Sequence, residues 1–435
     1  MKMTVTLDPA DDDAETARAF PGWIQAAPEA VGFSPDGLAR IDAAFQDRIN
    51  AGLVTGFVYA VARKGKLVAA NALGHVSVAD RSPLEQDSVF RLMSMTKPVT
   101  AVALMMLFEE GLFALDDPIS KYLPEFAEGS VLKAPDGPAD DTEPLVRPIT
   151  VRDVLRHTSG YGLGLGRAFG VSPTHEGLMA DQGVYWFGES LADQMVRIAS
   201  VPLATQPGAV WNYSLSPDIQ ARLVEVLGGQ DFATFLRARI FEPLGMKDTG
   251  FTVSSDMRAR LAGVSWMGPE GLTAWAPPTL PPEFPGMPWP EPIARLDEAL
   301  AYERGAFGLY STAGDYLRFA QTLLDGGRHA GGQLLKTETI ALMARDDLGG
   351  IPIDWKVKGV GFGLGFAVVR DVAATGFAGA DGTFYWDGAL GTIFWIDPAN
   401  ELVVVALAQH LLVPDMDPQA VNAAMHDLVY AALRS

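Results

Sequence analysis

The sequence predicts an α+β protein whose single antiparallel sheet is built from both ends of the chain. Strand-like runs lie near the N-terminus at Gly56–Ala62 and Leu67–Leu73, and further runs return from Tyr385 onward. Between them the pattern changes to short helices broken by proline and glycine. We expect helices to flank the sheet, because its apolar faces have to be buried against another layer.

The chain of 435 residues is long enough for two ordinary domains or for one large domain with an insertion. We expect residues 1–115 and 300–435 to form the sheet domain and residues 116–299 to form an inserted, mainly helical domain. The proline-rich stretch 277–292 lies inside the insertion. Two interpretations stay open for it, a stiff surface loop and an apolar wall over a substrate cleft.

Local patterns justify the N-terminal elements. Ser34-Pro35-Asp36-Gly37 is typical of a helix start, and apolar residues at helical spacing follow it. Arg63-Lys64-Gly65-Lys66 joins the two early strands and is typical of a hairpin turn. The apolar helical positions are Leu38, Ile41, Ala44, Phe45 and Ile49.

The later elements follow from the same rules. Helices are expected in the middle of the chain, strands near its end, and a last helix at about 418–433. The turn Asp397-Pro398-Ala399-Asn400 joins the last two strands. The expected middle helices are Val151–Arg156, Leu191–Ala199, Asp218–Leu227 and Phe232–Ile240, and the expected strands are Tyr385–Trp386, Thr392–Ile396 and Leu402–Ala408.

Composition excludes several classes of function. The chain has no cysteine, which rules out disulfides, thiolate catalysis and zinc–thiolate sites. Its six histidines form no close pair, so no metal or other cofactor is expected. A net charge of −20 argues against nucleic-acid binding. No apolar run approaches 18 residues, so no membrane span is expected, and a cytoplasmic location is the simpler expectation because the N-terminus shows no signal region.

Ser94-Met95-Thr96-Lys97 opens an apolar run that extends to Phe108. A serine and a lysine three residues apart at a helix start share one face, about one turn from each other. The amine can then accept or relay the proton of the hydroxyl group. Pro98 supports this placement, because proline is tolerated in the first turn of a helix. The positive end of the helix also favours an alkoxide or oxyanion.

A second Ser-x-x-Lys motif, Ser130-Val131-Leu132-Lys133, runs directly into the turn Ala134-Pro135-Asp136-Gly137. No helix is expected after this second motif because a turn follows it, so Ser94 is the candidate nucleophile. The alternative for Ser94 is a solvated serine that caps a helix.

Two further segments carry candidate chemistry. Tyr213-Ser214-Leu215 lies in a tight, irregular stretch ahead of a helix, and Trp386-Asp387-Gly388-Ala389 lies at a late strand. No serine has glycine two residues before and two residues after it, which disfavours an α/β-hydrolase.

A helix-borne Ser/Lys pair, a loop tyrosine and a strand glycine motif resemble the three boxes of the serine β-lactamase and penicillin-binding-protein superfamily, at the spacing of its class C branch. Leu155-Arg156-His157-Thr158-Ser159-Gly160 and the run from Gly305 to Thr312 are further matches. The matches extend over roughly residues 35–430 and imply a β-lactamase-like fold.

Two departures refine the resemblance. Leu215 replaces the asparagine of the Tyr-x-Asn box, and Trp386-Asp387-Gly388 replaces the usual Lys-Thr-Gly. The missing lysine helps to hold the carboxylate of a penicillin or of a peptide C-terminus. Asp387 brings a negative charge instead, so an anionic substrate loses an attraction. The chain is therefore most similar to the family VIII carboxylesterases, to which lovastatin-type acyltransferases are close relatives.

The resemblance implies a role for each matching residue. Ser94 matches the acylated nucleophile, Lys97 the group that accepts or relays its proton, and Tyr213 the second proton-transfer group. The backbone N–H groups of Ser94 and Ala389 match the oxyanion hole. Gly388 would let its strand approach the substrate closely.

Each assignment has a plainer alternative. Tyr213 could be a buried residue that bonds to the backbone, and Trp386 could be core instead of a pocket wall. Asp387 could face solvent, and His157 is expected to be a structural capping group and not a catalyst.

The expected function is that of a serine esterase acting on small, largely uncharged carboxylic esters through an acyl-enzyme. Three alternatives remain: a β-lactamase or D,D-peptidase, an acyltransferase, and a binding protein that kept the fold. A small-molecule ester is the expected partner. The sequence indicates no oligomeric state.

Overall fold

The computed structural model describes residues 15–162, 172–184, 189–268, 270–274, 303–351, 353, 358–411 and 419–434. The proline-rich stretch 277–292 lies outside these residues. In the described ranges, no helix has the length and the apolar character that a membrane crossing requires.

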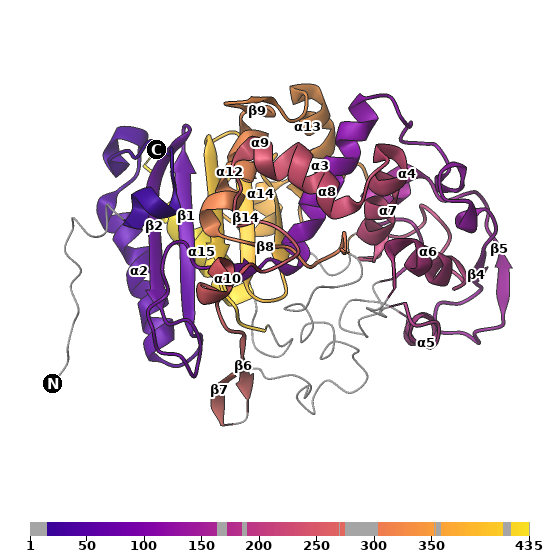
Figure 1. Cartoon of the computed structure of the whole chain (residues 1–435), viewed down its shortest axis with the longest axis horizontal. Coiled ribbons are helices and arrows are strands. Elements are labelled where there is room, and N and C mark those ends of the chain that lie inside the picture. The colour runs from indigo at the N-terminus through magenta and orange to yellow at the C-terminus, as the bar shows by residue number, and fades with distance from the viewer. Residues whose placement is uncertain are drawn as a thin grey trace.

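A seven-stranded antiparallel sheet occupies one side of the molecule (Figure 1). Its strand order is β11-β12-β13-β14-β15-β1-β2, so the first long strand pairs with the last one. The expected antiparallel sheet built from both ends of the chain is confirmed. The strands are β1 (Gly56–Arg63), β2 (Lys66–Gly74), β11 (Val360–Phe362), β12 (Ala367–Val369), β13 (Phe384–Gly388), β14 (Thr392–Asp397) and β15 (Leu402–Leu407).

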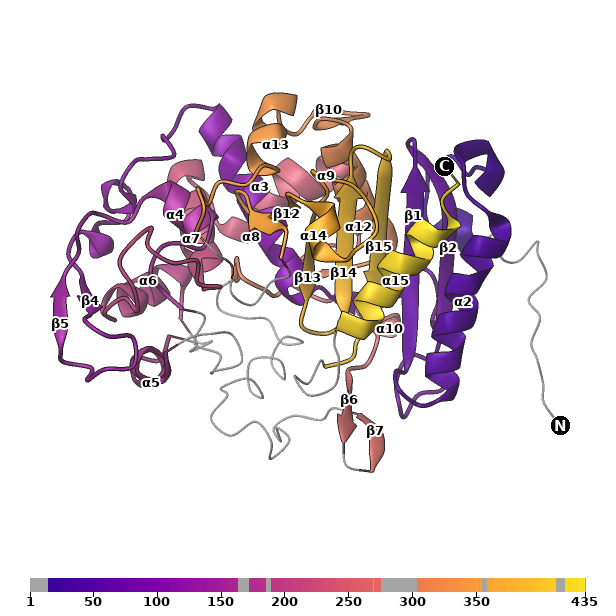
Figure 2. The ribbon, with the colours of Figure 1, turned by 180° about the vertical axis from the view of Figure 1, so that it is seen from behind.

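Both faces of the sheet are buried, because alternate side chains of each central strand belong to different apolar clusters. On β1, Val58 and Ala60 face one cluster, while Phe57 and Tyr59 face the other. Helices α2 (Pro35–Asn50) and α15 (Gln419–Ala432) cover one face, as seen from behind in Figure 2. Helix α12 (Ala313–Leu324) packs against β1, β14 and β15 on the other.

Helix α2 begins where the sequence predicts. The Ser34 hydroxyl accepts the Gly37 N–H over 3.2 Å, which satisfies one of the amides left free at a helix start. Pro35 occupies the first turn, where its missing N–H costs nothing. Phe45 stacks on Phe57 with ring centroids 4.0 Å apart, so the helix is fixed to the sheet.

The early hairpin turn is tighter than the four residues that the sequence suggests. Arg63 and Lys66 pair as the last residues of β1 and the first of β2. Only Lys64 and Gly65 form the turn, both with positive φ (54° and 69°). Two consecutive positive φ values match the twist of the flanking strands.

The other side of the molecule is mainly helical, and α3 (Thr96–Glu109) connects it to the sheet side (Figure 1). Helix α3 is buried along nearly its whole length and packs on α7. The predicted helices of this region are confirmed, except that Phe232–Ile240 divides into α8 and a following π-helical turn, Arg237–Phe241. The helices are α4 (Val151–Leu155), α5 (Pro173–Asp181), α6 (Leu191–Ala199), α7 (Ser216–Gly228), α8 (Phe232–Leu236), α9 (Glu242–Leu244) and α10 (Ser255–Ala259).

Short elements complete the described fold, and one of them leads directly to the Ser94 turn. Strand β3 (Phe90–Arg91) pairs with β8 (Tyr310–Ser311), and the Leu92 N–H donates to the Leu309 carbonyl over 2.8 Å. The remaining strand pairs and helices are β4 (Ser130–Leu132) with β5 (Thr142–Pro144), β6 (Ser265–Gly268) with β7 (Gly271–Ala274), β9 (Arg328–His329) with β10 (Gly332–Gln333), α13 (Thr337–Met343) and α14 (Val372–Thr375).

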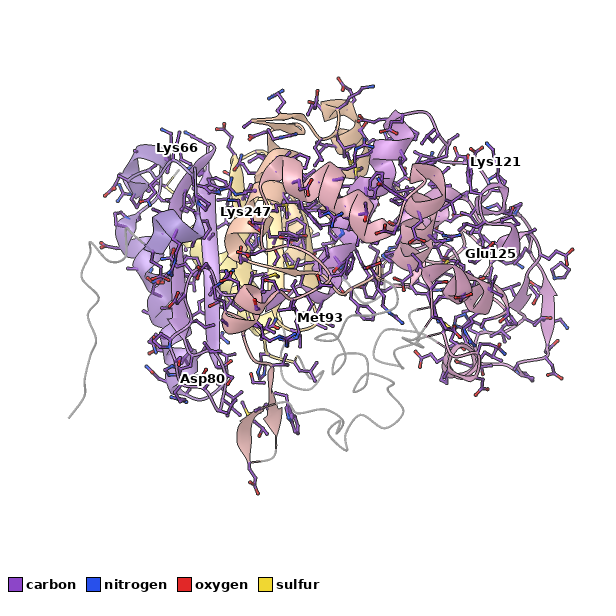
Figure 3. All side chains as sticks on the ribbon, viewed as in Figure 1. Lys66, Asp80, Met93, Lys121, Glu125 and Lys247 are labelled. Carbon is purple, nitrogen blue, oxygen red and sulfur yellow. The ribbon has the colours of Figure 1, made fainter. Side chains whose placement is uncertain are left out.

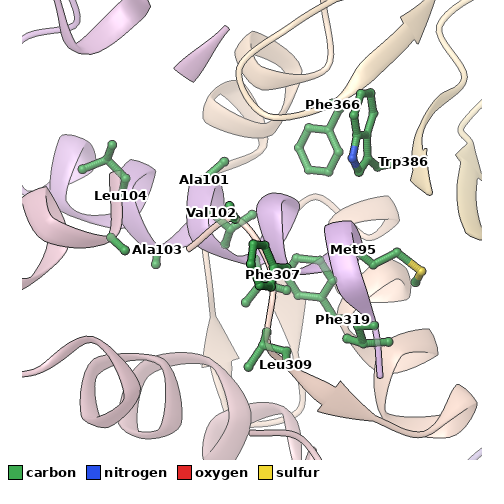
Figure 4. Packing of buried hydrophobic residues seen from close by; sticks show 14 of the residues in the cluster. Met95, Ala101, Val102, Ala103, Leu104, Phe307, Leu309, Phe319, Phe366 and Trp386 are labelled. Carbon is green, nitrogen blue, oxygen red and sulfur yellow. The ribbon is translucent and has the colours of Figure 1, made fainter. Parts of the chain in front are cut away.

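The core between the sheet and the helical side joins residues that are far apart in the sequence. Figure 4 shows Phe307 and Leu309 beside Met95 and Val102, with Phe366 and Trp386 nearby. All six belong to one buried cluster. The start of α3 is therefore held from several directions.

Candidate active site

Ser94 lies in the middle of a single 3₁₀ turn, Met93–Met95, immediately before α3. The predicted helix start beside Ser94 is thus correct to within two residues. Met93 has a φ of +51°, a left-handed conformation that side chains rarely adopt. Met93 and Met95 are buried, whereas Ser94 is partly exposed. Figure 3 labels Met93 in the middle of the molecule, between Asp80 on the sheet side and Glu125 on the helical side.

Lys97 follows in the first turn of α3 and is only 3% exposed. Its Nζ donates to the Ser94 hydroxyl over 3.1 Å and to the Ala306 carbonyl over 2.7 Å. Burial lowers the pKa of Lys97 to about 7, although the carboxylates of Asp218 and Asp387 oppose that shift. A large share of the amine is therefore neutral near pH 7 and able to accept a proton.

Tyr213 lies on the loop just before α7 and contacts both of these residues. The Lys97 Nζ stands 4.6 Å from the centre of its ring. Burial raises the pKa of the Tyr213 phenol, while its hydrogen bonds to the side chains of Ser94 and Trp386 act against that rise. The structure thus brings Ser94, Lys97 and Tyr213 together.

His157 contacts the Tyr213 loop through hydrogen bonds and through its ring. The His157 carbonyl accepts the Asn212 N–H over 2.9 Å, and its Nδ1 accepts the Ser214 N–H over 3.2 Å. Its ring centroid lies 5.1 Å from that of Tyr213. Burial, helped by the charge of Lys97, holds the pKa of His157 well below its usual value, so the ring is neutral. With a φ of +59° just after α4, His157 has the expected structural position.

A line of buried hydroxyl groups continues from His157. The Nδ1 atom of His157 lies 2.9 Å from the Ser214 hydroxyl, and the hydroxyl oxygens of Ser214 and Ser216 lie 2.8 Å apart. The Ser159 hydroxyl lies 2.8 Å from that of Ser216. These bonds tie the loop after α4 to the start of α7, and buried polar groups that are fully paired make such a connection rigid.

Strand β13 brings the third predicted segment to the Ser94 turn. Trp386 is buried, with its ring 5.4 Å from that of Tyr213. Asp387 is half-buried, and its charge acts on both Lys97 and Tyr213. Ala389 follows the strand and is partly exposed. The role of its N–H in an oxyanion hole stays a prediction.

Gly388 explains how β13 comes so close. A Cβ atom there would lie 2.5 Å from the Leu92 carbonyl oxygen and 2.2 Å from Thr392 Oγ1. Thr392 Oγ1 in turn donates to that same carbonyl over 3.0 Å. No side chain fits between the strand and the turn that carries Ser94.

The second Ser-x-x-Lys motif does not form such a site. Ser130 begins strand β4, and Lys133 lies beyond the end of that strand in an exposed ion pair with Asp141. The two residues therefore do not share a helix face. Among the residues that the structure describes, no group of three His, Asp or Glu side chains is placed to hold a metal ion.

Sequence reasoning gave no individual role to Asp218, Arg304 or Ala306. The structure places Asp218 and Ala306 near Lys97, and Arg304 beside Asp218. The Ala306 carbonyl is a direct partner of Lys97, and the Asp218 carboxylate accepts the Ala306 N–H over 2.9 Å. Asp218 follows Tyr213 by five residues, and Arg304 directly precedes the family-like run that starts at Gly305. Asp218 lies in the first turn of a helix that also carries Gln220, Arg222 and Glu225, so no local signal marks it.

The chain is similar to known proteins in sequence and in fold. A family model described as Beta-lactamase matches residues 41–427. Esterase EstB of Burkholderia gladioli is 34% identical, with 90% of this chain and 95% of EstB covered. Lovastatin esterase of Penicillium rubens is 30% identical, with 87% and 95% covered. The solved structure of EstCE1, described as a hydrolase with promiscuous acyltransferase activity, has a TM-score of 0.76 at 26% identity and covers 91% of this chain and 99% of its own.

Replacing Gly388 with alanine should push β13 away from the Ser94 turn, because the added carbon meets backbone oxygen at 2.5 Å. We expect a loss of about 1–3 kcal/mol in the free energy of unfolding, measured by urea denaturation. Gly250→Ala is the matched control, since a Cβ at Gly250 meets no atom within 4 Å. Equal stability of the two variants would contradict the close approach of β13.

Proposed function

Because this chain belongs to the beta-lactamase family, we propose that it is a serine esterase that hydrolyses small, largely uncharged carboxylic esters through an acyl-enzyme on Ser94. The observation that carries the proposal is the buried Lys97 amine, 3.1 Å from the Ser94 hydroxyl. The names of EstB, lovastatin esterase and EstCE1 support an esterase on this fold.

In the proposed acylation step, the Ser94 Oγ attacks the carbonyl carbon of the ester while its proton passes to Lys97 or Tyr213. The carbonyl oxygen becomes an oxyanion, which the N–H groups of Ser94 and Ala389 would stabilise. Collapse of the tetrahedral intermediate breaks the bond to the alcohol oxygen. The departing alkoxide takes up the transferred proton and leaves as the free alcohol.

In the proposed deacylation step, water adds to the acyl-enzyme carbonyl and gives its proton to the same pair of groups. The bond to Ser94 Oγ then breaks, the serine regains a proton, and the carboxylic acid leaves. Which of Lys97 and Tyr213 is the base in each half-reaction stays open. Lys97 can serve because burial lowers its pKa to about 7. Tyr213 is a neutral phenol near pH 7, so it can serve as a relay that gives up its own proton as it accepts that of Ser94.

Substrate charge is the proposed basis of selectivity. Strand β13 presents Trp386 and Asp387, and the Asp387 charge acts on both proton-transfer groups. A neutral ester needs only the nucleophile, its proton partners and the oxyanion donors. A penicillin or a peptide C-terminus also needs a partner for its carboxylate, and here an acidic residue stands in place of a lysine.

An acyltransferase is the second candidate function. EstCE1 is described as a hydrolase with promiscuous acyltransferase activity. Transfer differs from hydrolysis only in the second nucleophile, which would be an alcohol instead of water. Product analysis with an added alcohol distinguishes the two activities.

A serine-directed phosphonate should add its mass to the peptide that contains Ser94, because this hydroxyl is paired with a buried amine. Ser94→Ala should lose esterase activity by several orders of magnitude while remaining folded. Ser130→Ala is the matched control and should keep full activity. Labelling of Ser130, or of another serine in place of Ser94, would refute the assignment.

Neutral short-chain esters should be better substrates than β-lactams, because a lost charge-assisted hydrogen bond costs roughly 10- to 100-fold in kcat/KM. Asp387→Lys should move the ratio of kcat/KM values toward anionic substrates, whereas the exposed control Asp136→Lys should leave it unchanged. The measurement compares p-nitrophenyl acetate and butyrate with a chromogenic cephalosporin. Faster turnover of the cephalosporin by the unaltered protein would contradict the proposed selectivity.

A further inference from the structure

The backbone of Gly305 and Ala306 is hydrogen-bonded to two helices, α3 and α7. On the α3 side, the Ala306 carbonyl accepts from Lys97 over 2.7 Å, and the Thr100 hydroxyl donates to the Gly305 carbonyl over 2.8 Å. On the α7 side, the Ala306 N–H donates to Asp218 Oδ1 over 2.9 Å. This short segment therefore connects the Asp218 carboxylate to the Lys97 amine through one residue.

Tight packing makes this connection stiff. A Cβ atom at Gly305 would lie 2.0 Å from the Pro217 carbonyl oxygen, so the segment touches the backbone at the start of α7. Phe307 and Leu309 continue from it into the buried cluster beside Met95 (Figure 4). The Ala306 carbonyl has little freedom to move away from Lys97.

A carboxyl group and a guanidinium group are buried in the same place. Burial raises the pKa of Asp218, and the charge of Arg304 and the Ala306 N–H oppose that rise and favour the ionised carboxylate. Asp218 is 5% exposed and Arg304 is 1% exposed, and a guanidinium nitrogen of Arg304 lies 3.9 Å from Asp218 Oδ2. Arg304 also lies over the Phe307 ring, 4.8 Å from its centre. Removing both groups from water costs free energy, and this cost suggests that the buried pair has a specific role.

We propose that Asp218 is a positioning residue for Lys97, and that its charge, balanced by Arg304, sets the pH range in which Lys97 accepts the Ser94 proton. This inference rests on the proposed esterase function. Asp218 acts in two ways: through the Ala306 peptide it fixes where the amine lies, and through space its negative charge favours the protonated amine. Arg304 supports the second effect, because its positive charge favours the ionised form of the buried Asp218 carboxyl group.

The other ionisable groups around Lys97 do not replace Asp218 as the buried charge that acts on the amine. Among the described residues these are Tyr213 from the loop before α7, His157 from the segment after α4 and Asp387 from β13. Burial keeps Tyr213 and His157 neutral near pH 7. Asp387 is half-buried and in reach of solvent, so water screens its charge more than that of Asp218.

The sign of the pH effect follows from these charges. The unaltered protein should lose kcat/KM as the pH falls through about 7, because Lys97 becomes protonated and no longer accepts a proton. Asp218→Asn removes the charge that favours protonation and leaves Arg304 unbalanced. The acidic limb of the pH profile should therefore move to lower pH, by about one pH unit. Arg304→Met should move the limb to lower pH as well, because the buried Asp218 carboxyl group then takes up a proton more readily and loses its charge.

The experiment measures kcat/KM for p-nitrophenyl acetate against pH in these two variants and in Asp218→Glu, which keeps the charge and should keep the limb in place. Asp315→Asn is the control: Asp315 is also buried and accepts a backbone N–H, from Asp248 over 2.8 Å, at the start of α12. It should leave the limb unchanged. The pH dependence of phosphonate labelling at Ser94 provides a second readout that needs no turnover.

The proposal is overturned if Asp218→Asn or Arg304→Met moves the limb to higher pH, or if neither moves it. It is also overturned if Asp218→Asn fails to fold while Asp315→Asn folds, because the amide oxygen should still accept the Ala306 N–H. If the unaltered protein has no esterase activity and Ser94 takes no label, the proposed function itself is wrong. The two failures are therefore distinguishable.

Discussion

The burial of one amine beside one hydroxyl group is the constraint on which the site depends. Lys97 is 3% exposed, and a charged amine in such surroundings is costly unless it is paired. Burial lowers its pKa to about 7, so the protonated and neutral forms lie close in free energy at neutral pH. The Ala306 carbonyl and the Ser94 hydroxyl take up the polar contacts that remain. An ordinary surface lysine would stay charged and could not accept a proton at this pH.

The fold holds this amine by bringing distant segments to the first turn of α3. The Tyr316 hydroxyl donates to the Met95 carbonyl over 2.9 Å, and Thr96 Oγ1 accepts the Leu309 N–H over 3.2 Å. Strand β13 closes from the sheet side because Gly388 has no side chain. The Tyr213 loop closes from the helical side, held by His157. The Ser94 turn therefore lies between strand β13 on the sheet side and the Tyr213 loop on the helical side.

Sequence reasoning predicted the elements whose signal is local. Helix α2 has its capping serine and its apolar face within 16 residues, and Ser94 and Lys97 are three residues apart. Strands β11 and β12 were missed because each has only three residues, too few for an alternating pattern. Helix α12 was missed as well, although its sequence is amphipathic and the Thr312 side chain caps its start. The pairing of Asp218 with Arg304 joins residues that no local pattern relates. The domain boundaries and the role of the Ala389 N–H remain predictions.

The central claim is that Ser94, Lys97 and Tyr213 act as one proton-transfer unit, and a double-mutant cycle tests it most directly. The cycle compares kcat/KM for a neutral p-nitrophenyl ester in Lys97→Ala, Tyr213→Phe and the double variant, each shown to be folded by circular dichroism. If the three residues form one unit, either single change removes most of the activity and the double variant is hardly worse than the poorer single one. Losses in the two single variants that simply multiply in the double variant would contradict the account.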